Sequence, residues 1–402
     1  MTEKKPLMSV KQALSFLMDA VRPIQEFEVL PTLAASGRVL AQSQTSLLDV
    51  PPMDNTQMDG YAVRAADCVN GSCRLAVTQR IPAGYIGEPL VAGTAARIFT
   101  GAMIPIGADA VVMQEQCVAE GDDVIINHAP RPGEWVRRQG EDIRAGDTIL
   151  PAGTRLRAQE IGLAASVGLA TLPVLRPLKV AVFFTGDELT MPGEELKPGA
   201  IYNSNRFTLT ALLRSLGCEV TDYGIVPDTL QATRDTLRHA VQGHDMVLTS
   251  GGVSVGEEDH IRPAVEAEGR LNMWQIAVKP GKPLAFGEVG GAFFMGLPGN
   301  PVSSFVTFLL FVRPFLLRMQ GVENVTPTAY SVRADFDWLK PDRRQEYLRA
   351  RMNPNGGLDL FVNQSSGVLT STVWGDGLVE LMPGQSVQAG EFVRFIPFCS
   401  LN

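Results

Sequence analysis

Three stretches of the chain share one pattern: a short apolar run, a polar turn rich in glycine, and then a helical pattern. The apolar runs are 180–184, 246–248 and 293–295, and the turns that follow them are 185–188, 249–256 and 296–301. Short apolar runs that alternate with helical patterns indicate buried parallel strands joined by crossover helices. Because ligands lie outside the carboxyl ends of such strands, the pattern predicts one concentrated site for an anionic ligand at that edge.

The spacing of apolar residues also predicts the helices. Between about residue 178 and residue 318 it predicts helices at 206–216, at 230–241, at 261–268 and from Val302 onward. A further helix is predicted over 9–21, where Ser9 and Gln12 have capping-box spacing. Another is predicted over 158–167, closed by Gly168.

Two other regions have β-type patterns. From about residue 47 to residue 141, runs such as 97–99, 110–113 and 124–126 are separated by Gly, Pro and Asp turns. Near the C-terminus, 331–336, 346–349 and 391–396 alternate like the strands of a small barrel or sandwich. We therefore predict a multidomain α+β and α/β protein: a mixed linker domain (1–46 with 145–177), a β-rich domain (47–144), a doubly wound parallel-sheet domain (178–326) and a C-terminal β domain (327–402).

Composition excludes several classes of function. The length of 402 residues favours several domains, and the net charge of −8 argues against nucleic acid as a partner. The N-terminus lacks an apolar signal core, and the longest uncharged apolar run, 305–312, is far shorter than the ~20 residues of a membrane span. The five cysteines form no CxxC pair and the four histidines are dispersed, so a thiolate or imidazole metal site is not expected. We expect a reduced, cytoplasmic protein.

The turn 249–256 is the strongest local motif. A buried strand that opens into Ser-Gly-Gly-Val-Ser-Val-Gly exposes successive backbone N–H groups, which can hold phosphate oxygens. Asp259 follows and could hold Mg²⁺ against those oxygens. The alternative interpretation makes Asp259 the N-cap of the helix predicted from Ile261.

Charged residues lie in two other turns. Lys279 and Lys282 stand on a turn stiffened by prolines, where ammonium groups suit an oxyanion, although most lysines are merely solvated. The turn 185–188 brings carboxylates to a strand end, which implies Mg²⁺ if the ligand is anionic; a plain polar turn is the alternative. Asp228 begins a capping-box pattern, which favours a structural role.

The turn 296–301 is dense in glycine and proline and lies between an apolar strand and an apolar helix, so its backbone is fixed in an uncommon shape. Ser303 and Ser304 then fall at a helix start, where N–H groups and hydroxyls can bind an oxyanion. In the β-rich region, Asp59-Gly60 is a strong turn signal. The mixed-charge loop that contains Arg137 and Asp142 has surface ion pairing as its default interpretation.

In their order along the chain, these motifs resemble one family. The segments are Met58-Asp59-Gly60-Tyr61-Ala62, Thr185-Gly186-Asp187-Glu188-Leu189, 250–256, Lys279-Pro280-Gly281-Lys282-Pro283 and Leu297-Pro298-Gly299-Asn300-Pro301. They are similar to those of the molybdopterin molybdenumtransferases (MoeA), the family that includes the E domain of gephyrin. The resemblance covers nearly the whole chain.

The resemblance implies an elongated four-domain homodimer, in which the linker domain contributes to dimerisation. Its central molybdopterin-binding-like domain is shared with the adenylyltransferases. It also implies insertion of molybdate into adenylylated molybdopterin, with Mg²⁺ assisting and AMP released. Contacts with the adenylyltransferase and with molybdoenzyme-maturation proteins follow from the same resemblance.

The resemblance further assigns residue roles. The catalytic candidates are Asp59, Thr100, Arg137, Asp142, Glu188, Asp228 and Asp259, of which the last three are also candidates for binding Mg²⁺. The candidates for binding substrate or oxyanion are Gly251, Gly252, Ser254, Lys279, Pro280, Lys282, Pro283, Pro298, Pro301, Ser303, Arg349 and one of Ser366 or Ser371. The four catalytic candidates of the β-rich domain would reach the cleft from the partner subunit.

Two residues depart from the family pattern. Gln275 stands where related chains can carry a lysine, and Asn203 replaces an aspartate often found there. Three alternatives stay open: the adenylyltransferase step, which would need only the central domain, a scaffold that has lost catalysis, and a preference for tungstate over molybdate.

Overall fold

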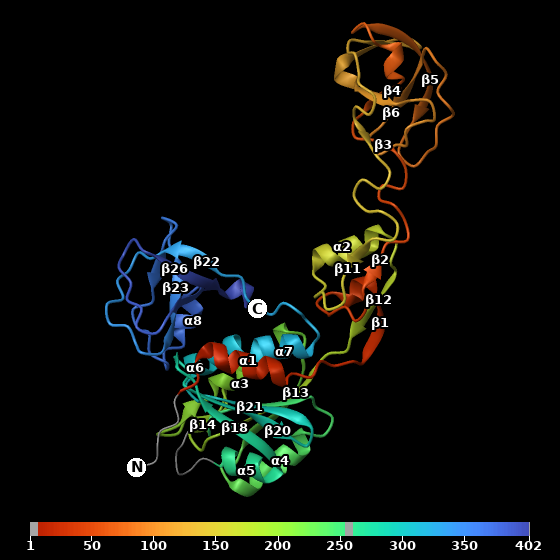
Figure 1. The fold of residues 1–402 in the computed structure, drawn as a ribbon. Coiled ribbons are helices and arrows are strands. Elements are labelled where there is room, and N and C mark those ends of the chain that lie inside the picture. The colour runs from red at the N-terminus through yellow and green to blue at the C-terminus, as the bar shows by residue number, and fades with distance from the viewer. Residues whose placement is uncertain (1–6, 254–259, 402) are drawn as a thin grey trace.

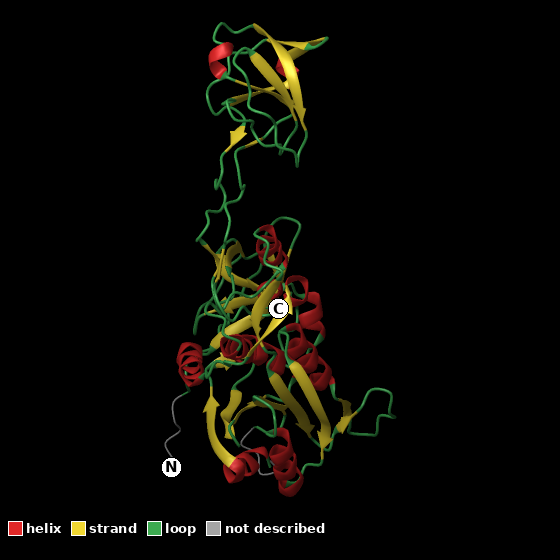
Figure 2. Cartoon of the chain, turned by 90° about the vertical axis from the view of Figure 1, so that its right-hand side faces the viewer, coloured by secondary structure: helices red, strands yellow, loops and turns green. Residues whose placement is uncertain are grey.

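The protein is elongated, and its structural units are arranged along one long axis (Figure 1). The structure is a computed structural model that describes residues 7–253 and 260–401. One β-rich unit lies at the far end, and a larger α/β unit and the C-terminal unit lie at the other (Figure 1). The view turned by 90° shows the same long axis and two extended chain segments that join the β-rich unit to the rest (Figure 2).

The central sheet contains the three strands that the apolar runs predict. They are β13 (Lys179–Thr185), β17 (Met246–Ser250) and β21 (Ala292–Leu297), and they lie side by side in parallel. The complete order is β16-β13-β17-β21-β20-β18, where β16 (Glu219–Val226) pairs in parallel with β13. The parallel half of the prediction is confirmed.

The other edge of this sheet is antiparallel, which the sequence analysis did not predict. Strands β20 (Pro283–Val289) and β18 (Gly269–Gln275) both pair in antiparallel fashion. The reversal occurs at Gly290 and Gly291, whose φ angles are +56° and +90°. Two residues with positive φ form the favoured hairpin turn, so Gly-Gly was the signal for this edge.

Helices cover both faces of the sheet. On one face, α1 (Val10–Ala20), α3 (Ser204–Ser215), α6 (Pro301–Thr307), the π turn η4 (Phe308–Val312) and α7 (Arg313–Met319) contribute to one large apolar core. On the other face, α4 (Leu230–Ala240) and α5 (Ile261–Glu268) pack over a second core. The capping box between Ser9 and Gln12 is present. The sheet is therefore doubly wound, as expected.

The continuous helix Pro301–Met319 is the one helix within the described residues that is long and apolar enough to cross a membrane. Within it, 89% of the apolar window is buried inside the protein. Residues such as Phe308, Phe311 and Phe315 contribute to the central core, so this is a core helix.

The β-rich unit is one six-stranded sheet with an apolar core on each face. Its strand order is β7-β4-β6-β5-β9-β8. The strands are β4 (Gly60–Val63), β5 (Cys73–Ile81), β6 (Thr94–Ile98), β7 (Ala110–Met113), β8 (Cys117–Glu120) and β9 (Asp123–Ile126). Cys68 and Cys73 form a disulfide, contrary to the expectation of reduced cysteines, because the turn between them brings their Cα atoms to 5.4 Å.

The segments on either side of the β-rich unit are paired with each other. Strand β1 (Phe27–Pro31) pairs with β12 (Thr171–Leu175), and β2 (Gln44–Thr45) pairs with β11 (Thr148–Leu150). Helix α2 (Ala158–Ser166) packs beside them, one residue shorter than predicted, and Gly168 follows with a φ of +79°. Chain segments far apart in sequence thus form one small mixed unit.

The C-terminal unit is joined to the central unit through a shared sheet. Strand β19 (Val278–Lys279) pairs with β23 (Gln345–Met352), and the sheet continues through β25 (Gly377–Leu381), β26 (Phe392–Pro397) and β22 (Tyr330–Arg333). Strand β24 (Leu358–Leu360) branches from β23, and α8 (Thr370–Trp374) packs nearby. The lysine turn therefore lies at the junction of the two units.

Candidate active site

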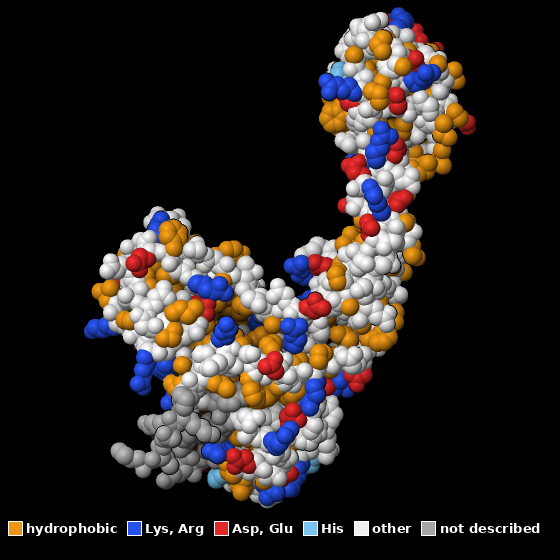
Figure 3. Space-filling view, in the orientation of Figure 1, with side chains coloured by type: hydrophobic (Ala, Val, Ile, Leu, Met, Phe, Trp, Pro, Cys, Tyr) orange, Lys and Arg blue, Asp and Glu red, His pale blue; other side chains and the backbone are white. Residues whose placement is uncertain are grey.

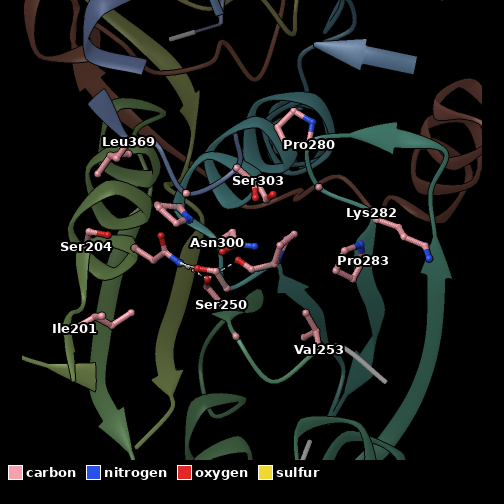
Figure 4. Close-up of a pocket in the computed structure, with 18 of the residues that line it drawn as sticks. Ile201, Ser204, Ser250, Val253, Pro280, Lys282, Pro283, Asn300, Ser303 and Leu369 are labelled. Carbon is pink, nitrogen blue, oxygen red and sulfur yellow. Dashed lines mark hydrogen bonds between the residues drawn. The ribbon is translucent and has the colours of Figure 1, made fainter. Parts of the chain in front are cut away.

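A cleft of about 1020 Å³ opens at the carboxyl edge of the parallel strands. It is lined by the turns after β13, β17 and β21, by the lysine turn and by a loop of the C-terminal unit (Figure 4). The predicted site residues on its wall are Glu188, Gly251, Gly252, Lys279, Pro280, Lys282, Pro283, Pro298, Pro301, Ser303 and Ser366. The structure thus brings together residues from five separate stretches of the sequence.

Hydrogen bonds hold the start of α3 and the turns after β17 and β21 against one another. Asn205 Nδ2 donates to Ser250 Oγ at 2.8 Å and to the carbonyl of Gly299 at 2.7 Å. Ser250 Oγ in turn donates to the carbonyl of Pro298 at 2.9 Å. Because Ser250 is buried, this network fixes the relative positions of the turns before any ligand binds.

The glycine turn has a conformation that few other residues could adopt. Gly251 and Gly252 have φ angles of +95° and +62°, and a Cβ on Gly251 would lie 3.1 Å from the carbonyl oxygen of Thr185. Ser254 and Asp259 lie outside the described residues. The N-cap position of α5 falls on His260, whose side chain makes no capping hydrogen bond.

The two lysines of the lysine turn have different surroundings. Lys279 Nζ lies 3.0 Å from Glu346 Oε1 and 3.5 Å from Asp342 Oδ2. Glu346 Oε1 nevertheless accepts no hydrogen bond within the described part of the chain, so its attraction to Lys279 is mainly coulombic. Lys282 is exposed and extends away from Ser250 and Asn300, with no acidic side chain within 4.0 Å among residues 7–253 and 260–401.

The cations on the wall of the cleft are partly paired with the carboxylates of Asp342 and Glu346 behind it. The described lining of the cleft carries Lys279, Lys282 and Arg344 as cations and Glu188 as its single carboxylate, although the whole protein has a net charge of −8. Arg344 is not among the residues predicted from the sequence, and it is hydrogen-bonded to Asp342 at 2.8 and 3.0 Å. These hydrogen bonds hold the pKa of Asp342 well below its usual range. Its signal was the basic pair 343–344 next to a predicted strand.

The two described carboxylates that were predicted to bind Mg²⁺, Glu188 and Asp228, do not both line the cleft. Glu188 is exposed on the cleft wall, whereas Asp228 is not among the lining residues. The N-cap of α4 is Thr229, whose side chain accepts a hydrogen bond from Ala232 N, so Asp228 is not the cap that its pattern predicted. Within 7–253 and 260–401, no three Asp, Glu, His or Cys side chains form a group that could hold a metal.

Arg349 and Ser371 lie behind the cleft wall. Both are fully buried, and Arg349 Nε donates to Ser371 Oγ at 3.0 Å. The backbone of Arg349 is bonded in both directions to the side chain of Gln364, which lines the cleft together with Ser366. Burial lowers the pKa of Arg349 to about 10, so its guanidinium stays charged at pH 7. The pair therefore supports the lining loop and does not itself line the cleft.

The candidates of the β-rich unit lie far from the cleft of their own chain (Figure 1). Asp59 Oδ1 accepts from the backbone N–H of Thr100 at 2.8 Å and from its hydroxyl at 2.7 Å, which lowers the pKa of Asp59. Arg137, on β10 (Val136–Arg137), donates to Asn55 Oδ1 at 3.3 Å. The N–H of Asp142 donates to the carbonyl of Val50. Asp59 and Thr100 thus form a pair, while none of the four joins the cleft within one chain.

Comparison with known proteins covers the chain in three parts. Residues 8–168 match the model of the MoeA N-terminal region (domain I and II), residues 181–318 a probable molybdopterin binding domain, and residues 331–398 the MoeA C-terminal region (domain IV). The molybdopterin molybdenumtransferase of Haemophilus influenzae is 39% identical, over 98% of this chain and 99% of its own length. The chain belongs to the MoeA family.

Other MoeA-family proteins resemble the chain over its whole length. The molybdopterin molybdenumtransferase of Nostoc sp. is 36% identical, over 95% of this chain and 91% of its own. The crystal structure of the molybdopterin biosynthesis moeA protein from Pyrococcus horikoshii OT3 superposes with a TM-score of 0.84 at 31% identity, over 98% of this chain and all of that one. The multidomain MoeA fold is therefore common to them.

Proposed function

We propose that the protein is a molybdopterin molybdenumtransferase of molybdenum cofactor biosynthesis. It inserts molybdate into adenylylated molybdopterin and releases AMP. The observation that carries this proposal is the cleft at the carboxyl edge of the parallel strands, whose described wall includes the glycine turn, the start of α6 and Lys282, which has no acidic side chain within 4.0 Å among residues 7–253 and 260–401. A substrate with a pyrophosphate link and a second oxyanion needs such surroundings.

The cleft residues divide into groups by their chemistry. The N–H of Gly252 and the start of α6 at Ser303 would supply donors for phosphoryl oxygens, while the N–H of Gly251 donates to the carbonyl of Leu297 at 3.1 Å and holds the turn in place. Lys279 and Lys282 offset the charge that collects on the pyrophosphate as its P–O bond breaks. A water or a molybdate oxygen, oriented by these groups, attacks phosphorus, and AMP leaves.

We propose that a Mg²⁺ ion is bound jointly by Glu188 and the substrate, since the described residues do not gather enough carboxylates to hold it alone. Mg²⁺ is commonly bound through one or two carboxylates plus substrate phosphates, keeping several waters. Glu188 is the carboxylate that the described cleft wall offers. When bound, the ion would neutralise phosphate charge and draw the pyrophosphate towards Glu188. Asp228 and Asp259 remain candidates for the same shell.

The site is completed across a homodimer in this proposal. Asp59 and Thr100 are hydrogen-bonded to each other at an exposed turn, yet their unit is remote from the cleft of the same chain. With Arg137 and Asp142, they would enter the cleft of a second copy. Support comes from the elongated shape, since a remote unit on a narrow connection can reach a partner (Figure 3).

Several finer features belong to the same proposal. We propose the domain boundaries 1–46 with 145–177, 47–144, 178–326 and 327–402. The C-terminal unit would be a closed barrel, since an isolated bridge between Ala334 and Leu358 links the end of β22 to β24. The protein would act in the cytoplasm, with the adenylyltransferase and molybdoenzyme-maturation proteins as partners.

The test is molybdate-dependent release of AMP. Purified protein with Mg²⁺, molybdate and adenylylated molybdopterin should release AMP and form active cofactor, and Lys279→Met should lower turnover about ten- to a hundredfold. Molybdate-independent formation of adenylylated molybdopterin would instead identify the adenylyltransferase step. A folded dimer that releases no AMP would identify a scaffold.

A further inference from the structure

The N-terminus of α3 opens into the cleft. Ser204 and Asn205, its first residues, line the wall, and Ser204 is visible there beside Ile201 (Figure 4). The N-cap is Asn203, whose Oδ1 accepts a hydrogen bond from Arg206 N at 3.1 Å. The first N–H groups of an α-helix lack acceptors within the helix, and the helix dipole adds partial positive charge there. This end of the cleft therefore favours an anion.

Two buried polar groups beside this helix end have no partner in the described part of the chain. Asn203 is 2% exposed and Thr185 is 4% exposed, and both line the cleft. Neither Asn203 Nδ2 nor Thr185 Oγ1 has a hydrogen-bond partner among residues 7–253 and 260–401. Buried polar groups in folded proteins are nearly always paired, so two unpaired ones at one cleft point to a ligand that pairs with both.

The backbone holds these groups at one side of the cleft. Asn203 N donates to the carbonyl of Thr190 at 3.0 Å, and Ile201 N donates to the carbonyl of Glu188 at 2.7 Å. Strands β14 (Leu189–Thr190) and β15 (Ile201–Tyr202) pair in parallel through this contact. The segment after β13 is thereby hydrogen-bonded to the residues before α3. Asn203 is held between strand β15 on one side and helix α3 on the other.

We propose that Asn203 Nδ2, the Thr185 hydroxyl and the N-terminus of α3 form a subsite that binds a phosphoryl oxygen of the substrate. The identity of the substrate rests on the proposed function, whereas the affinity for a phosphoryl group does not. An amide donates a hydrogen bond where a carboxylate at the same position could only accept one. This chain therefore binds the anion directly at a position where an aspartate would need a cation between the two charges.

Two substitutions separate the amide donor from the helix cap. Asn203→Asp and Asn203→Ser both keep an oxygen that can cap α3, and neither leaves a nitrogen at the position of Nδ2. Both should keep the thermal midpoint of the wild type. Titration calorimetry in EDTA should show affinity for AMP or inorganic pyrophosphate about ten- to a hundredfold lower. Mg²⁺ should restore much of the affinity of Asn203→Asp and none of that of Asn203→Ser.

Thr185→Val gives an independent second test. Replacing an unpaired buried hydroxyl with a methyl of similar shape should leave the free protein as stable or more stable, while the affinity for the anion falls severalfold. Thr229→Ala is the matched control, because it removes the cap of α4, away from the cleft, and should lower stability without changing affinity.

Wild-type affinity for both anions in both Asn203 variants, or no binding of either anion by the wild type, would overturn the subsite. These outcomes are independent of turnover. If the wild type releases AMP while the variants bind anions normally, the subsite alone fails. If the variants lose affinity but the folded wild type releases no AMP, the proposed function fails and the subsite stands.

Discussion

At the scale of single residues, the carboxylate of Glu346 positions the ammonium group of Lys279. The side chain of Glu346 is 1% exposed, and its Oε2 accepts from Trp338 Nε1 at 3.0 Å and from Asp342 N at 2.8 Å. Its other oxygen lies 3.0 Å from Lys279 Nζ. A buried carboxylate fixed by two donors thus anchors a cation that also lines the cleft. Such a cation is pre-positioned for an incoming anion.

This arrangement predicts measurable coupling between the two residues. Glu346→Gln leaves a buried site without its charge and should lower the free energy of unfolding by about 1–2 kcal/mol, less than for a fully buried pair because Lys279 is partly exposed. In denaturant unfolding, the double variant Glu346→Gln with Lys279→Met should lose less free energy of unfolding than the sum of the losses of the two single variants. Additive losses would show that the pair does not interact.

At the scale of elements, the turns around the cleft are shaped by glycine and proline. Gly281 has a φ of +107°, and a Cβ there would lie 2.4 Å from Thr307 Oγ1. The lysine turn consequently packs directly on α6. This contact and the pairing of β19 with β23 fix the backbone positions of Lys279 and Lys282.

Gly281→Ala should therefore disturb both stability and binding. We expect the free energy of unfolding to fall by about 1–3 kcal/mol from backbone strain and the clash with Thr307. Gly291→Ala is the matched control, since Gly291 also has a positive φ, +90°, but no atom within 4 Å of its Cβ position. Both variants should lose stability, and only Gly281→Ala should weaken the binding of AMP. Equal AMP affinity in both would contradict the role of the turn.

Elements with strong periodic patterns were predictable. Helix α5 has the predicted bounds, and α4 ends one residue earlier than predicted. The strands β16, β18 and β20 were missed. Only the last residue of β16, Val226, is buried, so this strand lacks the apolar run that revealed β13. β18 and β20 are antiparallel strands whose signal, Gly290-Gly291, lies in the turn between β20 and β21.

At the scale of the whole molecule, the distance between the β-rich unit and the cleft is the main consequence of the fold. Both views show this unit at the far end of the long axis (Figures 1 and 2). If Asp59 acts in catalysis, it must do so in the cleft of another copy. In that case, a dimer with two composite sites would follow.

Mixing inactive variants tests the composite site. Asp59→Asn and Glu188→Gln should each be nearly inactive as homodimers. Co-refolded in equal amounts, they should recover about a quarter of wild-type AMP release, because half of the randomly paired dimers contain one intact site of two. A mixture of Glu188→Gln with Lys279→Met, both in the cleft, should show no more than the mean activity of the two single variants, because every cleft then carries one substitution. No recovery in the first mixture would show that Asp59 acts within its own chain or not at all.

The sequence by itself determined the parallel strands, their helices and the turns that carry chemistry, because these depend on local periodicity and on glycine and proline. It also supported the family resemblance. Only the tertiary structure decided which of these residues share a cleft. It placed Arg344 there and left Arg349 behind the wall, since both positions depend on how the C-terminal sheet joins β19. It also left Asn203 Nδ2 and Thr185 Oγ1 without partners among residues 7–253 and 260–401, because burial and pairing arise from contacts between distant segments.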